Sequence, residues 1–229
     1  MSSLIGITQR VSVVPEYGER RDALDQAWAR FFSACDLDPL IIPNGLADPC
    51  AYIQKMGVKG LVLTGGNNFS DAVKTIRNRP VCNLPQCDDL APERDETEIA
   101  LLKQSIENDL PVIGVCRGMQ LLNLFYGGEI SSVKNHVGLY HNLTTRRGVE
   151  IPFEIMFDKK VNSFHDFGIH SSGMSLEFDI LAQTGDVVES FIHRKYPHMG
   201  IMWHPERNVK PSVNDIDLFR KYFARGGKK

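Results

Sequence analysis

Apolar and polar positions alternate in blocks along the first half of the chain. Short runs of continuous apolar residues recur, and the segments between them carry apolar residues at helical spacing. The predicted strands cover residues 4–7, 40–42, 60–64 and 111–115. The predicted helices cover residues 22–34, 96–108 and 117–126. Continuous apolar strands separated by amphipathic helices are typical of a parallel sheet covered on both faces.

The second half of the chain has a stronger β pattern. Short strands are predicted at 149–157, 180–184, 187–192 and 199–203, a closing helix around 216–223, and a frayed tail at 226–229. We therefore expect an α/β fold, with a mostly parallel central sheet, helices on both faces in flavodoxin-like layering, and a small antiparallel β subregion. The polar stretch 67–92 has few packing positions, and we expect it to form a wall or lid of the site.

Length, composition and charge favour one domain over residues 1–229. Hydrophobic residues make up 42% and charged residues 24%, as in ordinary globular proteins. The net charge of −2 offers no attraction to nucleic acids or membranes, so neither is expected as a partner. The first residues lack a secretion signal, and no apolar run reaches the ~18 residues of a membrane span, which favours a cytoplasmic location. The oligomeric state stays open, a homodimer included.

The five cysteines are odd in number and scattered along the chain. This pattern disfavours a disulfide framework and favours a reducing compartment. Cys82 and Cys87 are too far apart for a tight Cys-x-x-Cys zinc knuckle, and no histidine lies close by. We therefore expect no metal site.

Cys116 stands between Gly114 and Gly118, directly after the apolar run 111–115. This arrangement is typical of a nucleophile on a strand-to-helix turn, where small neighbours allow close packing of the backbone. The positive end of the following helix would favour the thiolate. For the cysteine alone, an inert buried thiol explains the pattern equally well.

His204 and Glu206 flank Pro205 after another predicted strand. Because proline discourages a helix, we expect an extended segment in which both side chains project to one side. The carboxylate would then orient the imidazole as the acid of a catalytic triad does. The order nucleophile, His, acid differs from that of α/β-hydrolases, which disfavours their fold. In the alternative interpretation the segment has no catalytic role: it is a structural turn after a strand, and Glu206 is solvated.

Two main-chain amides are candidates for an oxyanion hole. The amide of Arg117 follows the nucleophile at a helix start, and Gly66 follows a neighbouring strand. Two donors aimed at one developing oxyanion are what acyl transfer requires. The pair Gly65–Gly66 is also compatible with a plain tight turn.

The segment Gly114–Gln120, combined with His204–Glu206, resembles the class I glutamine amidotransferase-like superfamily, and within it the free-standing γ-glutamyl hydrolases. Weaker parts of the likeness lie at 94–98, 136–141 and 161–165. The resemblance implies Cys116 as nucleophile, His204 as general base and acid, and Glu206 as the residue that orients it. It also implies that the amides of Gly66 and Arg117 form the oxyanion hole, with no metal or organic cofactor.

The resemblance further implies where the glutamyl group would bind. The implied substrate-binding residues are Gln120, Asn162, Ser163, Phe164 and His165, with Ser163 and Phe164 acting through the main chain. Arg94 and Asp95 stay undecided between a structural ion pair and a contact to ligand.

At a finer level, segments 6–10, 17–25 and 200–207 are similar to the γ-glutamyl-CDP-amidate hydrolases of bacterial capsule phosphoramidate synthesis. That likeness implies removal of glutamate from a nucleotide-linked amide, leaving cytidine diphosphoramidate. A diphosphate favours arginine partners, and Arg10, Arg20 and Arg21 are the candidates. They are equally explained as solvated charges at a helix start, and no glycine-rich phosphate loop of the Walker type is present.

Three other functions stay open. One is a γ-glutamyl-polyamine or GABA-type hydrolase. Another is a glutaminase subunit that passes ammonia to a synthase; since the sequence continues only briefly beyond Glu206, the acceptor would be a separate protein. A third is a non-catalytic binding protein, which the intact Cys, His and Glu and the lack of a basic recognition helix disfavour.

Overall fold

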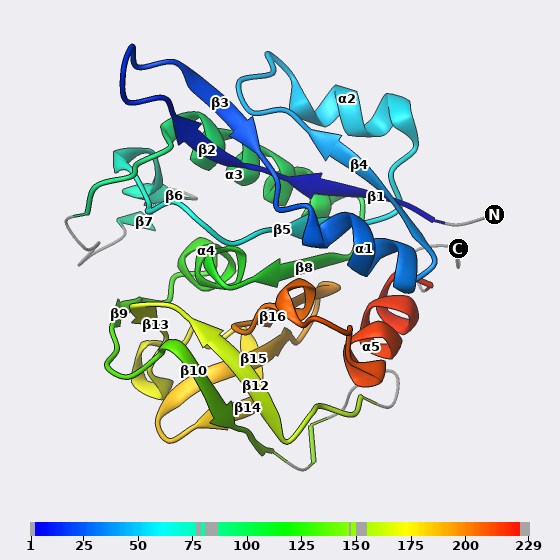
Figure 1. Ribbon diagram of the computed structural model, residues 1–229, viewed down its shortest axis with the longest axis vertical. Helices are drawn as coiled ribbons and strands as arrows, with labels where there is room; N and C mark the ends of the chain where they lie inside the picture. Colours follow the sequence, from blue (N-terminus) through cyan, green and yellow to red (C-terminus); the bar gives the residue numbers. More distant parts are fainter. Residues whose placement is uncertain (1–2, 77–78, 81–86, 147, 150–154, 225–229) are drawn as a thin grey trace.

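The computed structural model describes residues 3–76, 79–80, 87–146, 148–149 and 155–224. Its centre is an eight-stranded sheet with the order β11-β14-β15-β16-β8-β5-β1-β4 (Figure 1). Neighbouring strands run parallel from β4 to β16 and antiparallel from β16 to β11. The predicted α/β class, with an antiparallel part formed by the second half of the chain, is confirmed.

The strands of the central sheet are short. Its parallel part contains β1 (Ser3–Thr8), β4 (Leu37–Ile42), β5 (Leu61–Leu63), β8 (Val112–Val115) and β16 (His198–Ile201). Its antiparallel part contains β11 (Thr144–Thr145), β14 (Phe178–Thr184) and β15 (Val187–His193).

Four two-stranded sheets surround the centre. They are β2 (Arg10–Val13) with β3 (Arg20–Ala23), β6 (Thr75–Ile76) with β7 (Arg79–Pro80), β9 (Ser131–Ser132) with β13 (Phe167–Gly168), and β10 (Val137–Asn142) with β12 (Lys160–Phe164). The helices are α1 (Ala27–Ala34), α2 (Pro49–Met56), α3 (Pro92–Glu107), α4 (Arg117–Phe125) and α5 (Val213–Phe223). Short 3₁₀ turns cover Asp71–Val73, Ser171–Gly173 and Pro205–Arg207.

Two apolar cores lie on opposite faces of the sheet. Leu61 and Leu63 pack into the core that contains residues of α2, α3 and α4, whereas Val62 packs into the core of α1 and α5. Side chains alternate between the faces of a strand, so a wholly apolar strand supplies both cores. The predicted helices on both faces are therefore confirmed.

The structure differs from the predicted elements at several places. Helix α1 begins at Ala27 rather than at residue 22, because Asp22 pairs with Val11 in the β2–β3 hairpin. Helix α2, capped by the Asp48 side chain, has no counterpart among the predicted helices. The predicted strand 149–157 falls partly on residues 150–154, outside the described residues, and residues 155–157 form no strand. The predicted tail 226–229 also lies outside them.

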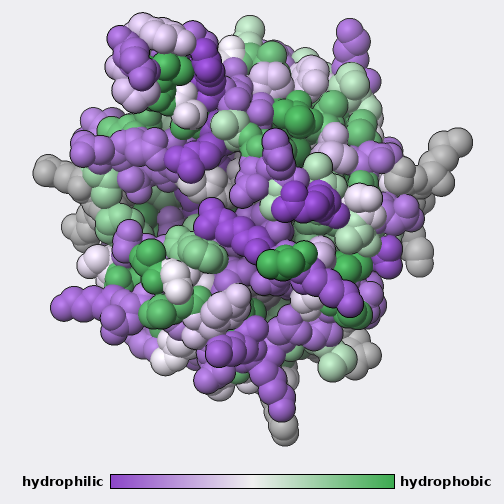
Figure 2. Space-filling view, in the orientation of Figure 1, coloured by the Kyte–Doolittle hydropathy of each residue, from purple (hydrophilic) through white to green (hydrophobic). Residues whose placement is uncertain are grey.

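No helix in the described part of the chain has the length and apolar character needed to cross a bilayer. In the space-filling view, polar side chains cover most of the visible face, and apolar side chains lie scattered among them (Figure 2).

Candidate active site

A cavity of about 560 Å³ opens at the carboxyl ends of the parallel strands. Gly66 follows β5, Cys116 follows β8, and His204 follows β16, so three neighbouring strand ends bring their residues together. Residues that line this cavity include Arg10, Gly66, Asn67, Asp89, Cys116, Arg117, Gln120, Phe164, His165, His204 and Arg207. Asn67, Asn68 and residues 87–89 form part of its wall, as predicted for the stretch 67–92, of which residues 77–78 and 81–86 are outside the described residues.

Cys116 occupies a strained turn between β8 and α4. Its backbone has φ 53° and ψ −107°, in a region that non-glycine residues rarely adopt. A Cβ atom added at Gly114 would collide with Gly118, and one added at Gly118 would collide with the carbonyl of Leu63. The two glycines therefore allow the close approach of strand and helix that the sequence indicates.

His204 and Glu206 are joined by a hydrogen bond of 2.7 Å between Nδ1 and Oε1. The prediction of an extended segment is wrong, because Pro205 begins a 3₁₀ turn. Proline suits the first position of a helical turn, where its missing N–H leaves no bond unmade. The carboxylate of Glu206 therefore reaches the ring of His204 through this tight turn, and not through the same-side projection of alternate residues in a strand.

The opposite edge of the imidazole faces Cys116. The Cys116 side chain and the ring of His204 meet at Gly65. A Cβ added at Gly65 would stand 3.4 Å from Cβ of Cys116, 3.4 Å from Nε2 of His204 and 2.7 Å from its ring carbon Cε1. Burial opposes protonation of His204, but the charges and hydrogen bonds of Cys116 and Glu206 outweigh it and raise the pKa of His204 to about 9. A cysteine beside an imidazole that a carboxylate supports is the arrangement of a cysteine nucleophile and its base.

Asn162 holds the main chain of His204 from both sides. Its Oδ1 accepts from the amide of His204 at 2.9 Å, and its Nδ2 donates to the carbonyl of His204 at 2.8 Å. The Asn162 side chain is buried and does not line the cavity. The structure therefore places this predicted substrate-binding residue in a positioning role.

The two predicted oxyanion-hole residues, Gly66 and Arg117, line the cavity together with Cys116. Arg94 donates from Nη1 to the carbonyls of Gly65 and Gly66 at 3.1 and 2.6 Å. In a trans peptide the N–H points opposite to the C=O, so the bond to Gly65 fixes the Gly66 amide pointing away from Arg94. Arg94 thus contacts the turn from behind.

A buried ion network lies beneath this end of the sheet. Arg94 pairs with Glu98 at 2.9 Å, and Arg117 pairs with both Asp95 and Glu98. Thr8 donates from Oγ1 to Glu98 at 2.7 Å. Burial opposes ionisation of Glu98, but Arg94 and Arg117 outweigh it and lower its pKa. The sequence leaves open whether Arg94 and Asp95 form a structural ion pair or contact a ligand; in the structure both form buried ion pairs, Arg94 with Glu98 and Asp95 with Arg117.

The other predicted glutamyl-binding residues lie at different depths. Gln120 lines the cavity and donates from Nε2 to the carbonyl of Phe167 at 2.7 Å. Phe164 and His165 also line it, and the Phe164 ring centroid lies 6.0 Å from that of His204. Ser163 is fully buried and its hydroxyl donates to the carbonyl of His136 at 2.6 Å, so only its main chain is available for the predicted contact.

The three predicted nucleotide-binding arginines lie on strands β2 and β3 of the hairpin rather than at a helix start. Arg10 lines the cavity and pairs with Asp89 at 3.2 Å. Arg20 pairs with Glu93 and Arg21 with Glu19, both at 2.6 Å, and neither lines the cavity. The structure thus brings only Arg10 to the triad.

Sequence reasoning missed Arg207 as a site residue. Its guanidinium lies 4.7 Å from the ring centroid of Phe164, and both side chains line the cavity. The only sign of this in the sequence is its position directly after Glu206.

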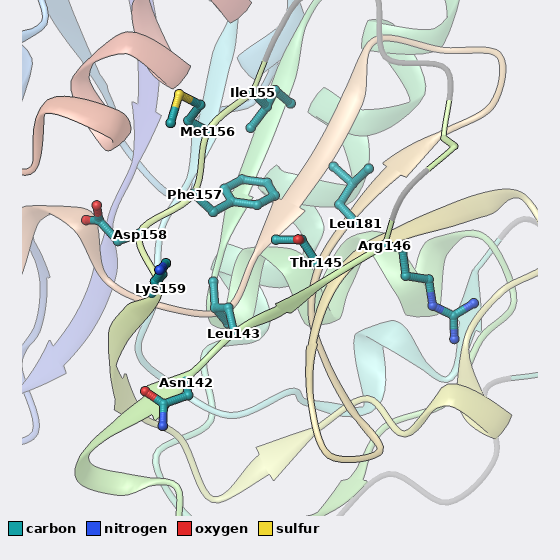
Figure 3. Close-up of a pocket in the computed structure, with 10 residues that line it drawn as sticks. All are labelled: Asn142, Leu143, Thr145, Arg146, Ile155, Met156, Phe157, Asp158, Lys159 and Leu181. Carbon is teal, nitrogen blue, oxygen red and sulfur yellow. The ribbon is translucent and has the colours of Figure 1, made fainter.

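A second hollow of about 600 Å³, shown in Figure 3, is lined by Leu143, Phe157 and Leu181 among others. None of its described lining residues is a cysteine or histidine, and none is a predicted site residue.

Comparison with known proteins identifies the family. The family model for peptidase C26 matches residues 3–206. A γ-glutamyl-CDP-amidate hydrolase from Campylobacter jejuni is 29% identical over 96% of this chain and 97% of its own length. A glutamine amidotransferase-like protein, YvdE, from Lactococcus lactis is 30% identical over 74% of each chain.

A solved structure shares the fold. A GMP synthase subunit from Thermoplasma acidophilum superposes with a TM-score of 0.66 at 18% identity, covering 99% of this chain and 94% of that one. The chain therefore belongs to the peptidase C26 family of class I glutamine amidotransferase-like hydrolases. Within that family, the likeness to the γ-glutamyl-CDP-amidate hydrolase extends over nearly the whole of both chains.

Proposed function

We propose that the protein is a cysteine-dependent hydrolase that cleaves a γ-glutamyl amide bond and releases glutamate. The observation that carries this proposal is the contact chain Cys116, His204, Glu206 at one cavity. A thiol beside an imidazole that a carboxylate orients is the arrangement needed for attack on a carbonyl carbon.

The reaction would proceed in two balanced steps. The Cys116 thiolate attacks the γ-carbonyl carbon, the C–N bond breaks, and His204 donates its proton to the departing nitrogen. Water then attacks the γ-glutamyl thioester and gives a proton to His204, the C–S bond breaks, and glutamate leaves with the thiolate restored. The amides of Gly66 and Arg117 would stabilise the oxyanion in both steps.

The substrate we favour is γ-glutamyl-CDP-amidate, which would give cytidine diphosphoramidate for modification of a capsular polysaccharide. The likeness to the Campylobacter jejuni enzyme over nearly both whole chains supports this choice. Arg10 and Arg207 line the same cavity and would offer cationic partners to a diphosphate. Phe164, on which Arg207 stacks, would hold Arg207 in place.

The test is glutamate release from a panel of amides: glutamine, a γ-glutamyl polyamine and γ-glutamyl-CDP-amidate. We expect the nucleotide amidate to be cleaved with the highest kcat/KM and the Cys116→Ala variant to be inactive. Cys50→Ala, which removes a thiol outside the cavity, serves as the matched control and should keep full activity.

Two outcomes would change the proposal. Glutamine as the best substrate, with ammonia as product, would point to a subunit that supplies ammonia to a synthase. Unchanged glutamate release in Cys116→Ala would contradict the thioester mechanism altogether. A covalent adduct of one γ-glutamyl group on the wild type, seen by intact-protein mass spectrometry and absent from Cys116→Ala, would support it.

A further inference from the structure

A second group of buried polar side chains lies next to the cavity, which only its member His165 lines, and the proposed reaction uses none of the group as nucleophile, acid or base. Its members are His136, His141, His165 and Glu189, each at most 9% exposed. His136 directly precedes β10 and His141 lies within it. His165 follows β12, and Glu189 lies within β15. The group therefore joins the small β10–β12 sheet to the central sheet.

The potential ligand atoms of these four residues all lie within 4.8 Å of one another. His136 Nδ1 stands 3.3 Å from His165 Nε2 and 3.6 Å from Glu189 Oε1. Two ligands that are each ~2.1 Å from a tetrahedral zinc ion lie roughly 3.4 Å apart. The two short separations match that spacing, and a pair at the 4.8 Å limit would close by roughly 1.4 Å.

Several polar atoms of this group lack the partners that burial demands. Both carboxylate oxygens of Glu189 and the Nε2 atom of His141 have no hydrogen-bond partner among the described residues. Glu189 is fully buried, and its group contains no arginine or lysine. An unpaired carboxylate in such surroundings is costly unless a cation compensates it.

His165 is oriented as metal-binding histidines are. Its Nδ1 lies 2.9 Å from the carbonyl of Phe167, which can only accept, so the proton sits on Nδ1. The Nε2 atom that faces His136 therefore presents a lone pair. A backbone carbonyl behind the distal ring nitrogen is the usual support for a histidine that binds a metal.

We propose that His136, His141, His165 and Glu189 bind a Zn²⁺ ion. Three imidazole nitrogens and one carboxylate oxygen suit zinc, and four protein ligands complete its tetrahedral shell, as in structural sites. The ion would tie β12 to β15. Because Asn162 of β12 holds the main chain of His204, the site would stabilise the strand that positions the proposed base.

The experiment uses the whole chain. The protein is treated with a chelator, reloaded with Zn²⁺ or Co²⁺, and analysed by elemental mass spectrometry and visible absorption. We expect one Zn²⁺ per chain, the visible bands of tetrahedral Co²⁺ and a higher thermal midpoint with metal. A wild type that takes up no stoichiometric metal under these conditions overturns the proposal.

Variants locate the metal. His141→Ala and Glu189→Ala should lose the zinc and the tetrahedral Co²⁺ bands, whereas His170→Ala, which removes a half-exposed histidine paired with Asp186, should keep both. Should the cluster variants fail to fold, Cys116→Ala decides on its own, because its Co²⁺ spectrum should equal that of the wild type. Loss of the bands in Cys116→Ala would place the ion at the triad and refute the site. Neither result depends on glutamate release, so this proposal and the proposed function fail separately.

Discussion

Glu98 and Glu189 are both fully buried, yet their surroundings act on them in opposite directions. Burial opposes the charge of Glu98, but Arg94 and Arg117 outweigh it and hold its pKa below the ordinary value. Burial raises the pKa of Glu189 to about 8, and no arginine or lysine among the described residues forms an ion pair with it. Glu98 thus pairs with two arginines, whereas the described residues offer Glu189 only His136, whose Nδ1 lies 3.6 Å away.

The ion network around Glu98 and the histidine group around Glu189 thus differ in how the charge of a buried carboxylate is balanced. In the network beneath the triad, two arginines balance two acids, and each carboxylate oxygen of Asp95 and Glu98 meets a donor. In the histidine group, both carboxylate oxygens of Glu189 have no hydrogen-bond partner among the described residues, and the proposed Zn²⁺ would supply the balancing charge. The ion network balances its charges with its own side chains, whereas the histidine group favours a bound cation.

Breaking the complete network should have the largest effect on stability. Glu98→Gln removes the anion that faces two buried arginines, and we expect the free energy of unfolding to fall by about 3–5 kcal/mol. Urea denaturation measures it. Glu107→Gln, at an exposed position of the same helix, is the control and should change stability by less than about 0.5 kcal/mol. Similar losses in both variants would contradict the structural role of the network.

Glu189→Gln, unlike Glu98→Gln, should not lower the free energy of unfolding of the metal-free protein. In chelated protein at about pH 9, above the raised pKa of Glu189 of about 8, we expect an unchanged or higher free energy of unfolding, because a buried amide costs less than an unpaired carboxylate. With Zn²⁺ at about 100 times its dissociation constant, the wild type should gain about 2.7 kcal/mol, and the variant far less. Urea denaturation of both proteins with and without Zn²⁺ measures this. If the chelated variant lost as much stability as Glu98→Gln, the contrast between the two carboxylates would be wrong.

The triad offers a pH test of smaller size. The raised pKa of His204, about 9, means that the imidazolium contributes stability fully below pH 6.5, and that this contribution is lost as pH rises through about 9. We expect kcat/KM to decline through the same range as the imidazolium deprotonates. In Glu206→Gln the alkaline limb should move down by about one pH unit, equivalent to ~1.4 kcal/mol. An alkaline limb that stays in place would show that the carboxylate does not support the ring.

The exposed pair Arg20–Glu93 should have the smallest effect. It is a counterpart of the buried network, since Glu93 lies on the same helix as Glu98. Exposed pairs contribute little, so Arg20→Ala should lower the free energy of unfolding by at most about 1 kcal/mol. The same variant should leave KM for a nucleotide amidate unchanged, whereas Arg10→Ala should raise it. A larger rise in Arg20→Ala than in Arg10→Ala would restore Arg20 as a nucleotide contact.

Local pattern was sufficient for much of the fold and of the candidate site. Wholly apolar strands such as Leu61–Leu63 indicate a sheet with two covered faces, and the structure confirms it. Cys116 between two glycines indicates a cramped turn, which the positive φ of the cysteine bears out. These features depend on neighbouring residues, and short-range sterics decide them.

Other features escaped prediction because distant partners decide them. The β3 residues Arg20–Ala23 resemble a helix start, but pairing with β2 makes them a strand. Asn162 carries no local sign that it will clamp His204, 42 positions away. The histidine group combines residues that lie from 5 to 53 positions apart (141 − 136 and 189 − 136), with no short motif.

The order of apolar and polar residues determined the strands of the parallel sheet and most of the helices, and short motifs singled out Cys116, His204 and Glu206 as the proposed triad, because periodicity and motif are local properties of a chain. Only the tertiary structure decided that Arg94 and Asp95 form buried ion pairs and that Arg10 alone of three arginines reaches the cavity. It also decided that the Glu189 carboxylate is buried with no hydrogen-bond partner among the described residues. The physical reason is that burial and electrostatic compensation depend on which segments pack together, and the nearest charges in space come from distant parts of the sequence.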